Sequence, residues 1–364
     1  MYNKYPSSYI PILRMYNSHI LNPAHSFESV ASSLFGVQSQ IFNASAIAFA
    51  VRTEQKTFSQ FKHTLNTLRL IRLWGIRTTI HIYHPNDWCS LLSHLSVANN
   101  WYKTKMEADG IDIDGIGDKV LNIIKNVDYF DRNFLKNKGI DKKYLGAWGD
   151  LLIELNNRGY IFHYINPTNR NKLFGNVQVV FGKKIESAEQ LSDVKKKLAL
   201  KYFRAYAPAT LYDFKHWLGI TVRESDDYFC SIKEKLISVR CGCKEYYIEL
   251  GSQNTLDRIF QIYADDSNYY LLPKFDPLLL AYHDKSWIIE ENLRNKIWKV
   301  AGQVEGIILQ HGKAIATWRY KLKNKVIDFE ISPFCRRFSV KNMEKAAHKI
   351  ACFFERSIGT ITLT

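Results

Sequence analysis

The sequence predicts a mixed α+β fold, in which three tandem winged-helix units are followed by a C-terminal β-barrel-like domain. Three times along the chain, segments with helical periodicity are followed by two short runs of β-branched and aromatic residues around a turn. A supersecondary unit that recurs in the same order is typical of a tandem architecture. Beyond residue 265 the pattern changes to short apolar strands, which indicates a separate β domain.

The first unit is expected at residues 1–110, and its boundaries come from helix start and stop signals. Asn22-Pro23 ends one helical segment, because proline cannot continue a helix, and Ser26 is suited to cap the next one. The change to β-branched residues around Gly75 predicts a hairpin. We expect helices at residues 9–20, 27–35, 43–52, 57–65 and 85–98, with strands at 68–74 and 77–83.

The next two units, at residues 111–185 and 186–262, repeat this order, and residues 263–364 form the expected β domain. Thr221, with Glu224 three residues later, predicts a capping box at one helix start. The expected helices of these two units are 118–127, 131–138, 148–157, 192–206, 208–219 and 221–231, and the strands are 160–165, 176–181, 236–240 and 245–250. In the β domain we expect strands at 269–273, 296–300, 306–310, 313–320 and 326–331 and a closing helix at 342–358.

The charge distribution favours a polyanionic partner. The chain has 364 residues, 46% of them hydrophobic, and a formal net charge of +15. Residues 1–85 contain eight lysines and arginines against two acidic residues, and residues 291–364 contain fourteen against six. Two basic ends around a nearly neutral middle are typical of a surface that faces nucleic acid. The alternative is a basic charge excess of no functional meaning.

Other features of the composition restrict location and cofactor. No apolar run reaches the roughly 18 residues that a membrane span needs, and the N-terminus lacks the apolar core of a signal peptide. We therefore expect a cytoplasmic protein without a membrane partner, associated with the nucleoid when bound to DNA. Among the six cysteines only Cys241 and Cys243 are close, and no second pair has the spacing of a zinc site. We expect neither a metal nor a cofactor.

Two glutamines in a break between helices are the candidate catalytic residues. Gly36 interrupts two apolar helical runs, and Gln38 and Gln40 follow it. On an extended segment, residues two apart point the same way, so the two amides can converge on one water molecule. An amide does not titrate near neutral pH, so any chemistry here needs a positioned water rather than a base. The alternative is a structural role, in which the amides satisfy backbone groups at the helix ends.

Five stretches in this order along the chain resemble the AlkZ/YcaQ family of winged-helix DNA glycosylases. They are residues 36–40, 73–81, 202–210, 275–280 and 312–319. The family signature is Gln, an apolar residue, then Gln or Asp, and Gln38 and Gln40 match its Gln/Gln branch. Ser39 departs from the apolar middle position.

This resemblance implies a monofunctional glycosylase that excises cationic N-alkylated purines such as N7-alkylguanines, and in some members unhooks interstrand crosslinks. A cationic base already has a weak glycosidic bond, so the enzyme needs only to position water at C1′ and stabilise an oxocarbenium-like state. Gln38 and Gln40 would hold that water. The expected partner is double-stranded DNA carrying alkylated bases or crosslinks, bound by a monomer, and neutral lesions are expected to be poor substrates.

Five residues are candidate DNA contacts. Arg77 and His81 share a face of the first expected hairpin, although a structural histidine explains His81 equally well. Arg319, Lys321 and Lys323 alternate along an expected strand and would present one basic face to phosphates. An ordinary solvated face is the alternative.

Several other residues favour structural roles. Asp276 and Asp284 are expected to cap turns, and Tyr102 is expected to pack in the core rather than stack on a base. Two function classes compete with a glycosylase. One is a non-catalytic winged-helix DNA-binding protein, such as a transcription regulator. The other is an interaction module whose basic ends bind RNA or another acidic partner.

Overall fold

The computed structural model describes residues 3–98, 101–145, 150–166, 172–186, 189–334 and 338–364. Helices and strands are interspersed along the chain, as expected for a mixed α/β fold. The chain forms two compact units, one made of Met1–Thr64 with Lys195–Thr364 and the other of Leu65–Val194. The chain passes between the units within two helices, α4 (Phe58–Asn66) and α11 (Leu191–Tyr206).

The N-terminal part of the first unit carries the glutamine loop. Its elements are β1 (Asn3–Tyr5), α1 (Tyr9–Asn17), α2 (Phe27–Leu34), β2 (Val37–Gln38) and α3 (Phe42–Ala50). Ser26 caps α2 as predicted, because its side chain accepts a hydrogen bond from the backbone N–H of Ser29. Helix α3 is buried along most of its length, so it is a core helix rather than a surface one.

The same unit contains the third helix-then-hairpin segment expected from the sequence. It consists of α12 (Leu211–Leu218), α13 (Val222–Cys230), η4 (Lys233–Lys235), β8 (Leu236–Cys241) and β9 (Lys244–Glu249), followed by α14 (Gln253–Tyr263). The predicted capping box of Thr221 and Glu224 is present at α13. Strand β1 pairs in parallel with β8, so the N-terminus completes a three-stranded sheet with this hairpin.

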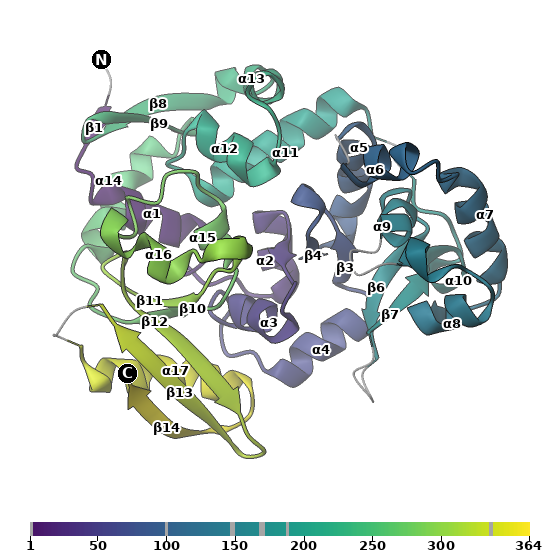
Figure 1. The fold of residues 1–364 in the computed structure, drawn as a ribbon. Coiled ribbons are helices and arrows are strands. Elements are labelled where there is room, and N and C mark those ends of the chain that lie inside the picture. The colour runs from purple at the N-terminus through teal and green to yellow at the C-terminus, as the bar shows by residue number, and fades with distance from the viewer. Residues whose placement is uncertain (1–2, 99–100, 146–149, 167–171, 187–188, 335–337) are drawn as a thin grey trace. The chain divides into compact units, whose positions relative to one another are not determined.

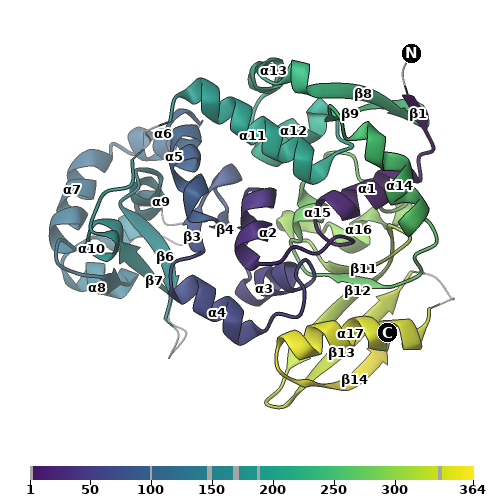
Figure 2. The ribbon, with the colours of Figure 1, turned by 180° about the vertical axis from the view of Figure 1, so that it is seen from behind.

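The C-terminal part of this unit is a five-stranded sheet with the order β10-β11-β12-β13-β14. Its elements are β10 (Tyr270–Leu272), α15 (Pro277–Leu280), η5 (Glu291–Leu293), α16 (Arg294–Ile297), η6 (Val300–Gly302), β11 (Gly306–Gln310), β12 (Lys313–Leu322), β13 (Val326–Pro333), α17 (Val340–Phe353) and β14 (Ser357–Leu363). The sheet is open, so the barrel-like closure expected from the sequence is wrong. Helix α17 covers one face of β13 and β14 (Figures 1 and 2).

The second unit combines the first two expected hairpins in one sheet. Strand β3 (Ile71–Trp74) pairs with β4 (Ile80–Tyr83) and also with β6 (Ile161–Ile165), which continues the sheet through β7 (Lys172–Asn176) to β5 (Tyr129–Phe130). The helices of this unit are η1 (Ile76–Thr78), η2 (Pro85–Asp87), α5 (Trp88–Val97), α6 (Trp101–Ala108), α7 (Ile113–Ile123), α8 (Arg132–Asn137), η3 (Lys142–Leu145), α9 (Asp150–Asn157) and α10 (Val177–Phe181). Tyr102 lies in the buried core of this unit, as expected.

Three local predictions are wrong. Residues 176–181 were expected as a strand, but Asn176 caps the helix α10 with its side chain. Residues 296–300 form the end of α16 and a turn, because Ala301 and Gly302 have positive φ and reverse the chain. The expected closing helix ends at Phe353 instead of residue 358. Glu355 has a φ of 57°, after which β14 pairs in parallel with β13.

Within the residues described, no helix is long and apolar enough to cross a membrane.

The close packing of Gly175 against an aromatic ring gives a stability prediction. A Cβ at Gly175 would lie 2.3 Å from the ring of Phe162, whereas a Cβ at Gly117 in α7 would lie at an ordinary 3.6 Å from Leu155. We expect Gly175→Ala to destabilise the second unit by about 1–3 kcal/mol through overpacking. Gly117→Ala should be neutral or stabilising, because alanine favours helix. Chemical denaturation of both variants tests this, and equal effects would contradict it.

Candidate active site

The glutamine loop begins with a sharp reversal at the end of α2. Phe35 has a φ of 50° and Gly36 a φ of 91°, so two successive residues adopt left-handed conformations. The backbone N–H of Gly36 donates to the carbonyl of Ala31, which closes the last turn of the helix. Phe35 is buried and anchors the turn in the core. The chain then extends through β2, as the sequence predicts for the segment after Gly36.

Within the loop, the central residue points into the protein. Ser39 is 0% exposed, and its Oγ lies 2.9 Å from Oγ of Ser45 in α3. Gln38 is 8% exposed, while Gln40 is exposed to solvent. Because side chains alternate along an extended chain, the inward direction of Ser39 favours a common outward direction for the two glutamines. One amide is therefore largely desolvated and the other is exposed to solvent.

A desolvated amide beside an exposed one can bind and orient water but cannot remove a proton. Each amide offers a carbonyl acceptor and two N–H donors, and neither changes charge near neutral pH. Such a pair is suited to a reaction whose leaving group departs without help from an acid. It does not suit a reaction that needs a general base with a pKa near the working pH.

A buried ion pair holds the far end of α3. Arg52 and Asp276 are both 0% exposed, and the guanidinium donates to the two carboxylate oxygens over 2.6 and 2.8 Å. Arg52 also donates to the carbonyls of Ser18 and Ala48, which brings the hydrogen bonds of its guanidinium to four. Asp276 accepts from the N–H of Leu278, and this confirms its expected role at the start of α15.

A second buried arginine binds one of the stretches that resemble the family, residues 202–210. Arg14 donates to the carbonyl of Pro208 through Nε and Nη2 at 2.9 and 2.7 Å. Its guanidinium also lies 3.7 Å from the centroid of the Tyr282 ring. Tyr282 in turn donates to the carbonyl of Tyr206. Burial raises the pKa of Tyr282 well above its usual value, so its hydroxyl stays a donor. Residues 202–210 are therefore part of the scaffold around α1.

Asp284 behaves as expected for a residue at a turn. Its carboxylate accepts from the N–H of Ser286 at 2.9 Å and pairs with Lys244 at 2.5 Å. These contacts lower the pKa of Asp284 to about 2 despite the opposing effect of burial. The observed contacts are those of a turn cap with a neighbouring cation.

The hairpin residues Arg77 and His81 lie in different environments. Arg77 has a φ of 55° and is partly exposed in η1, between β3 and β4. His81 is 3% exposed, and its Nδ1 lies 3.0 Å from the carbonyl of Thr79. Burial, aided by the charge of Arg77, lowers the pKa of His81 to about 3, so the ring is neutral. This favours the structural alternative for His81 and leaves Arg77 as the candidate contact of this pair.

The basic residues of β12 share one exposed face, but acidic neighbours accompany them. Arg319 and Lys321 alternate with less exposed residues, and Lys323 follows the end of the strand. Arg319 forms an ion pair with Glu305 at 3.0 Å, and Lys323 pairs with Asp328 at 2.5 Å. The face is therefore less positive than the sequence alone indicates, and a phosphate there would compete with these carboxylates.

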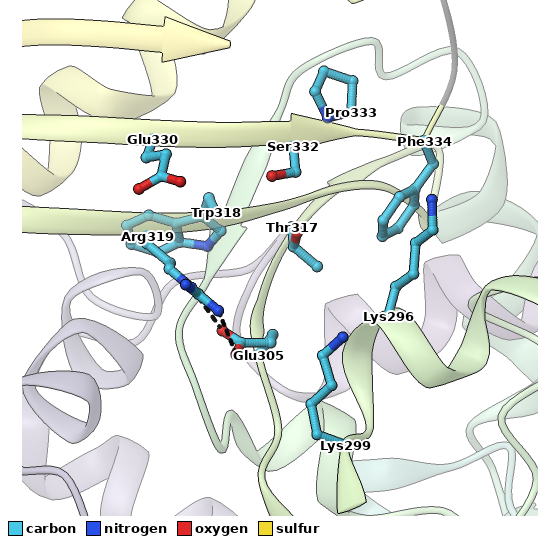
Figure 3. A pocket seen from close by; sticks show the side chains of 10 residues that line it. All are labelled: Lys296, Lys299, Glu305, Thr317, Trp318, Arg319, Glu330, Ser332, Pro333 and Phe334. Carbon is cyan, nitrogen blue, oxygen red and sulfur yellow. Dashed lines mark hydrogen bonds and ion pairs between the residues drawn. The ribbon is translucent and has the colours of Figure 1, made fainter. Parts of the chain in front are cut away.

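A pocket of about 310 Å³ adjoins this face (Figure 3). Arg319 and Glu305 form one side of it, and Lys296 lies beside Phe334 on another, with Lys299 from the segment after α16. Sequence reasoning missed both lysines, because it assigned residues 296–300 to a strand. The signal for them was the high net charge of residues 291–364, which Lys296 and Lys299 help to produce.

Comparisons with known proteins agree with this fold along its whole length. The chain is 22% identical over 346 residues to an interstrand DNA cross-link repair glycosylase of Streptomyces sahachiroi, and the match covers 90% of each protein. The solved structure of the Streptomyces sahachiroi DNA glycosylase AlkZ superposes with a TM-score of 0.82 at 21% identity. That superposition covers 99% of this chain and 100% of the other, so the two share a fold.

The class of protein that these findings define is a DNA glycosylase, an enzyme that acts on N-glycosyl bonds. More narrowly, the chain belongs to the DNA glycosylase AlkZ-like family, whose model matches residues 31–353. The matched range contains the glutamine loop, the whole second unit, most of the first unit and the basic face of β12.

The buried ion pair of Arg52 and Asp276 gives a prediction for stability. Arg52→Met leaves a buried carboxylate without its counter-charge, so we expect a loss of about 3–5 kcal/mol in the free energy of unfolding. Arg52→Met combined with Asp276→Leu should recover part of that loss, because no unpaired charge remains. Urea denaturation at neutral pH measures both. Arg294→Met, which removes an exposed ion pair, is the control. An Arg52→Met effect no larger than this control would contradict the prediction.

The buried His81 gives a prediction for pH dependence. The unfolded chain binds a proton near pH 6.5, whereas the folded ring resists protonation until about pH 3. Stability from this residue is therefore present above pH 6.5 and is lost as the pH falls below it, by at most about 1.4 kcal/mol per pH unit.

His81→Phe removes this titration and should flatten the decline of the unfolding midpoint between pH 7 and pH 5. It will not abolish the decline, because burial also lowers the pKa of His163 in the same unit. A decline as steep in His81→Phe as in the wild type would contradict this role.

Proposed function

We propose that this protein excises cationic N-alkylated purines of the N7-alkylguanine type from double-stranded DNA and also unhooks interstrand crosslinks. Membership of the DNA glycosylase AlkZ-like family supports the reaction class. The function of the Streptomyces sahachiroi relative, interstrand DNA cross-link repair, supports a crosslinked substrate. The observation that carries the proposal is the loop in which a buried Gln38 and an exposed Gln40 flank an inward Ser39.

In the proposed mechanism, the positive charge of the substrate base activates it as a leaving group, so no acid has to protonate it. The bond between C1′ and N9 breaks, its electron pair neutralises the cationic base, and positive charge develops at C1′. A water molecule then attacks C1′ and loses its proton to solvent. The amides of Gln38 and Gln40 hold that water through their carbonyl oxygens and orient it. No lysine nucleophile takes part, so the enzyme is monofunctional.

The desolvation of Gln38 supports this assignment. A hydrogen bond in a site of low dielectric constant is stronger than one in bulk water, so a water held by a buried amide is better fixed. A neutral amide also has a much smaller desolvation free energy on burial than a charged carboxylate. The arrangement stabilises a positive transition state by oriented dipoles rather than by full charge.

The DNA is proposed to lie against several basic contacts. Arg77 on the first hairpin and Arg319, Lys321 and Lys323 on the C-terminal sheet would bind phosphates without setting a sequence preference. His81 would act indirectly, by supporting the hairpin that carries Arg77. The three helix-then-hairpin segments at residues 1–110, 111–185 and 186–262 are proposed as winged-helix units of a DNA cradle, with residues 263–364 as the β domain.

Base release from a duplex that carries one N7-methylguanine tests this function. We expect the wild type to generate abasic sites, which hot alkali reveals as strand breaks. Gln38→Ala and Gln40→Ala should each lower the single-turnover rate at least about 100-fold, a loss typical of removing one positioned group in an active site. Their affinity for the same duplex should stay within a few fold.

Ser29→Ala serves as the control, because it alters a polar residue on the preceding helix and leaves the loop intact. A duplex with a single crosslink is then the second substrate, and release of one strand is the expected result. Tight, sequence-specific binding without base release would instead favour a non-catalytic DNA-binding protein. Strong binding to RNA with indifference to alkylation would favour an interaction module.

A further inference from the structure

Two serine hydroxyls meet beneath the glutamine loop. Ser39 and Ser45 are 0% and 1% exposed, and their Oγ atoms lie 2.9 Å apart. A hydroxyl that is removed from water must form hydrogen bonds to offset its desolvation. The two serines therefore form a specific hydrogen bond rather than a nonspecific packing contact.

The direction of this hydrogen bond follows from the number of protons. The hydroxyl of Ser45 lies 2.7 Å from the carbonyl of Phe42 and donates its single proton there. Ser45 can then only accept from Ser39, so Ser39 is the donor. The result is a directed chain from Ser39 through Ser45 to the backbone of the first turn of α3, in which each hydrogen bond polarises the next.

The helix that receives this contact is itself fixed. Its N-cap residue, Ile41, makes no side-chain capping bond, so the Ser39 contact is a side-chain tie between the loop and the first turn. Just beyond its other end, Arg52 is held by the buried carboxylate of Asp276. The loop is thus attached to a helix that cannot move without disrupting a buried ion pair.

We propose that Ser39 and Ser45 form a positioning pair that sets the direction of Gln38 and Gln40 for base excision. Ser39 lies between the two glutamines, so any shift of its Cα moves both neighbours, which are only about 3.8 Å away along the chain. Without either hydroxyl, both glutamines are still present, but the loop backbone is less restricted and their amides are no longer held in one direction. This inference rests on the proposed function, because it assigns a role relative to the glutamines.

The expected effect is on the chemical step rather than on binding. A misplacement of 1 Å in an active site can lower a rate about 100-fold, and removal of one hydrogen bond should cause a smaller shift. We expect Ser39→Ala and Ser45→Ala each to lower the single-turnover rate on the N7-methylguanine duplex about tenfold. The dissociation constant for that duplex should change less than twofold.

The test is a double-mutant cycle with a matched control. Single-turnover rate and DNA affinity are measured for Ser39→Ala, Ser45→Ala and the double variant at a temperature where all of them are folded. The thermal midpoint of each variant is measured separately. Ser225→Ala is the control, because Ser225 is also 1% exposed and also donates to a carbonyl three residues earlier, that of Val222. It lies in α13, outside the loop and α3, and should leave the rate unchanged.

A double variant about as slow as each single variant supports the positioning pair, because both changes remove the same contact. Rate losses that multiply in the double variant would overturn it. So would a fall in thermal midpoint with no fall in rate, since that pattern marks a structural role alone.

If the wild type releases no base, the proposed function fails. If the wild type is active and Gln38→Ala is inactive while both serine variants keep full rate, only the present inference fails.

Discussion

The ion pair between Arg52 and Asp276 connects the parts of the first unit that carry the candidate chemistry. Two charges without exposure to water are costly to bury, and this cost is offset here because the guanidinium and the carboxylate meet over two short contacts and have further backbone partners. Arg52 follows α3, and Asp276 begins α15, more than 220 residues later along the chain. The helix that follows the glutamine loop is therefore bound to the segment that connects β10 and β11 of the C-terminal sheet.

This constraint supplies what the proposed catalytic role of two uncharged side chains requires. Amides attract water weakly compared with a carboxylate, so they contribute to a reaction only if their direction is fixed in advance. The left-handed turn at Phe35 and Gly36, the inward Ser39 and the anchored α3 together restrict the loop. The proposed substrate class agrees with this, because a base that already carries positive charge needs no acid. Glu305 and Asp328 pair with Arg319 and Lys323, so they reduce the positive charge of the proposed DNA contacts on β12.

Much of this architecture was predictable from the sequence. Periodicity located α2, α3, α12 and α13, and the break at Gly36 identified the loop. The strand expected at residues 176–181 is a helix, because one side chain, that of Asn176, caps it. The pairing of β3 with β6 and of β1 with β8 depends on long-range contacts that no local pattern encodes. For the same reason the sequence could not reveal that Arg52 binds Asp276, that Ser39 meets Ser45, or that His81 is buried.

The most direct test of the account compares two lesions of different charge in one duplex sequence. One is N7-methylguanine, which is cationic, and the other is 1,N6-ethenoadenine, which is neutral and leaves only with help from an acid. The account predicts rapid release of the first with a rate that is nearly flat between pH 6 and pH 8, and release of the second slower by a factor on the order of 100 or more. Comparable release of both lesions, or a rate that follows the titration of a single group, would mean that a titrating acid or base drives the reaction instead of the amides of Gln38 and Gln40.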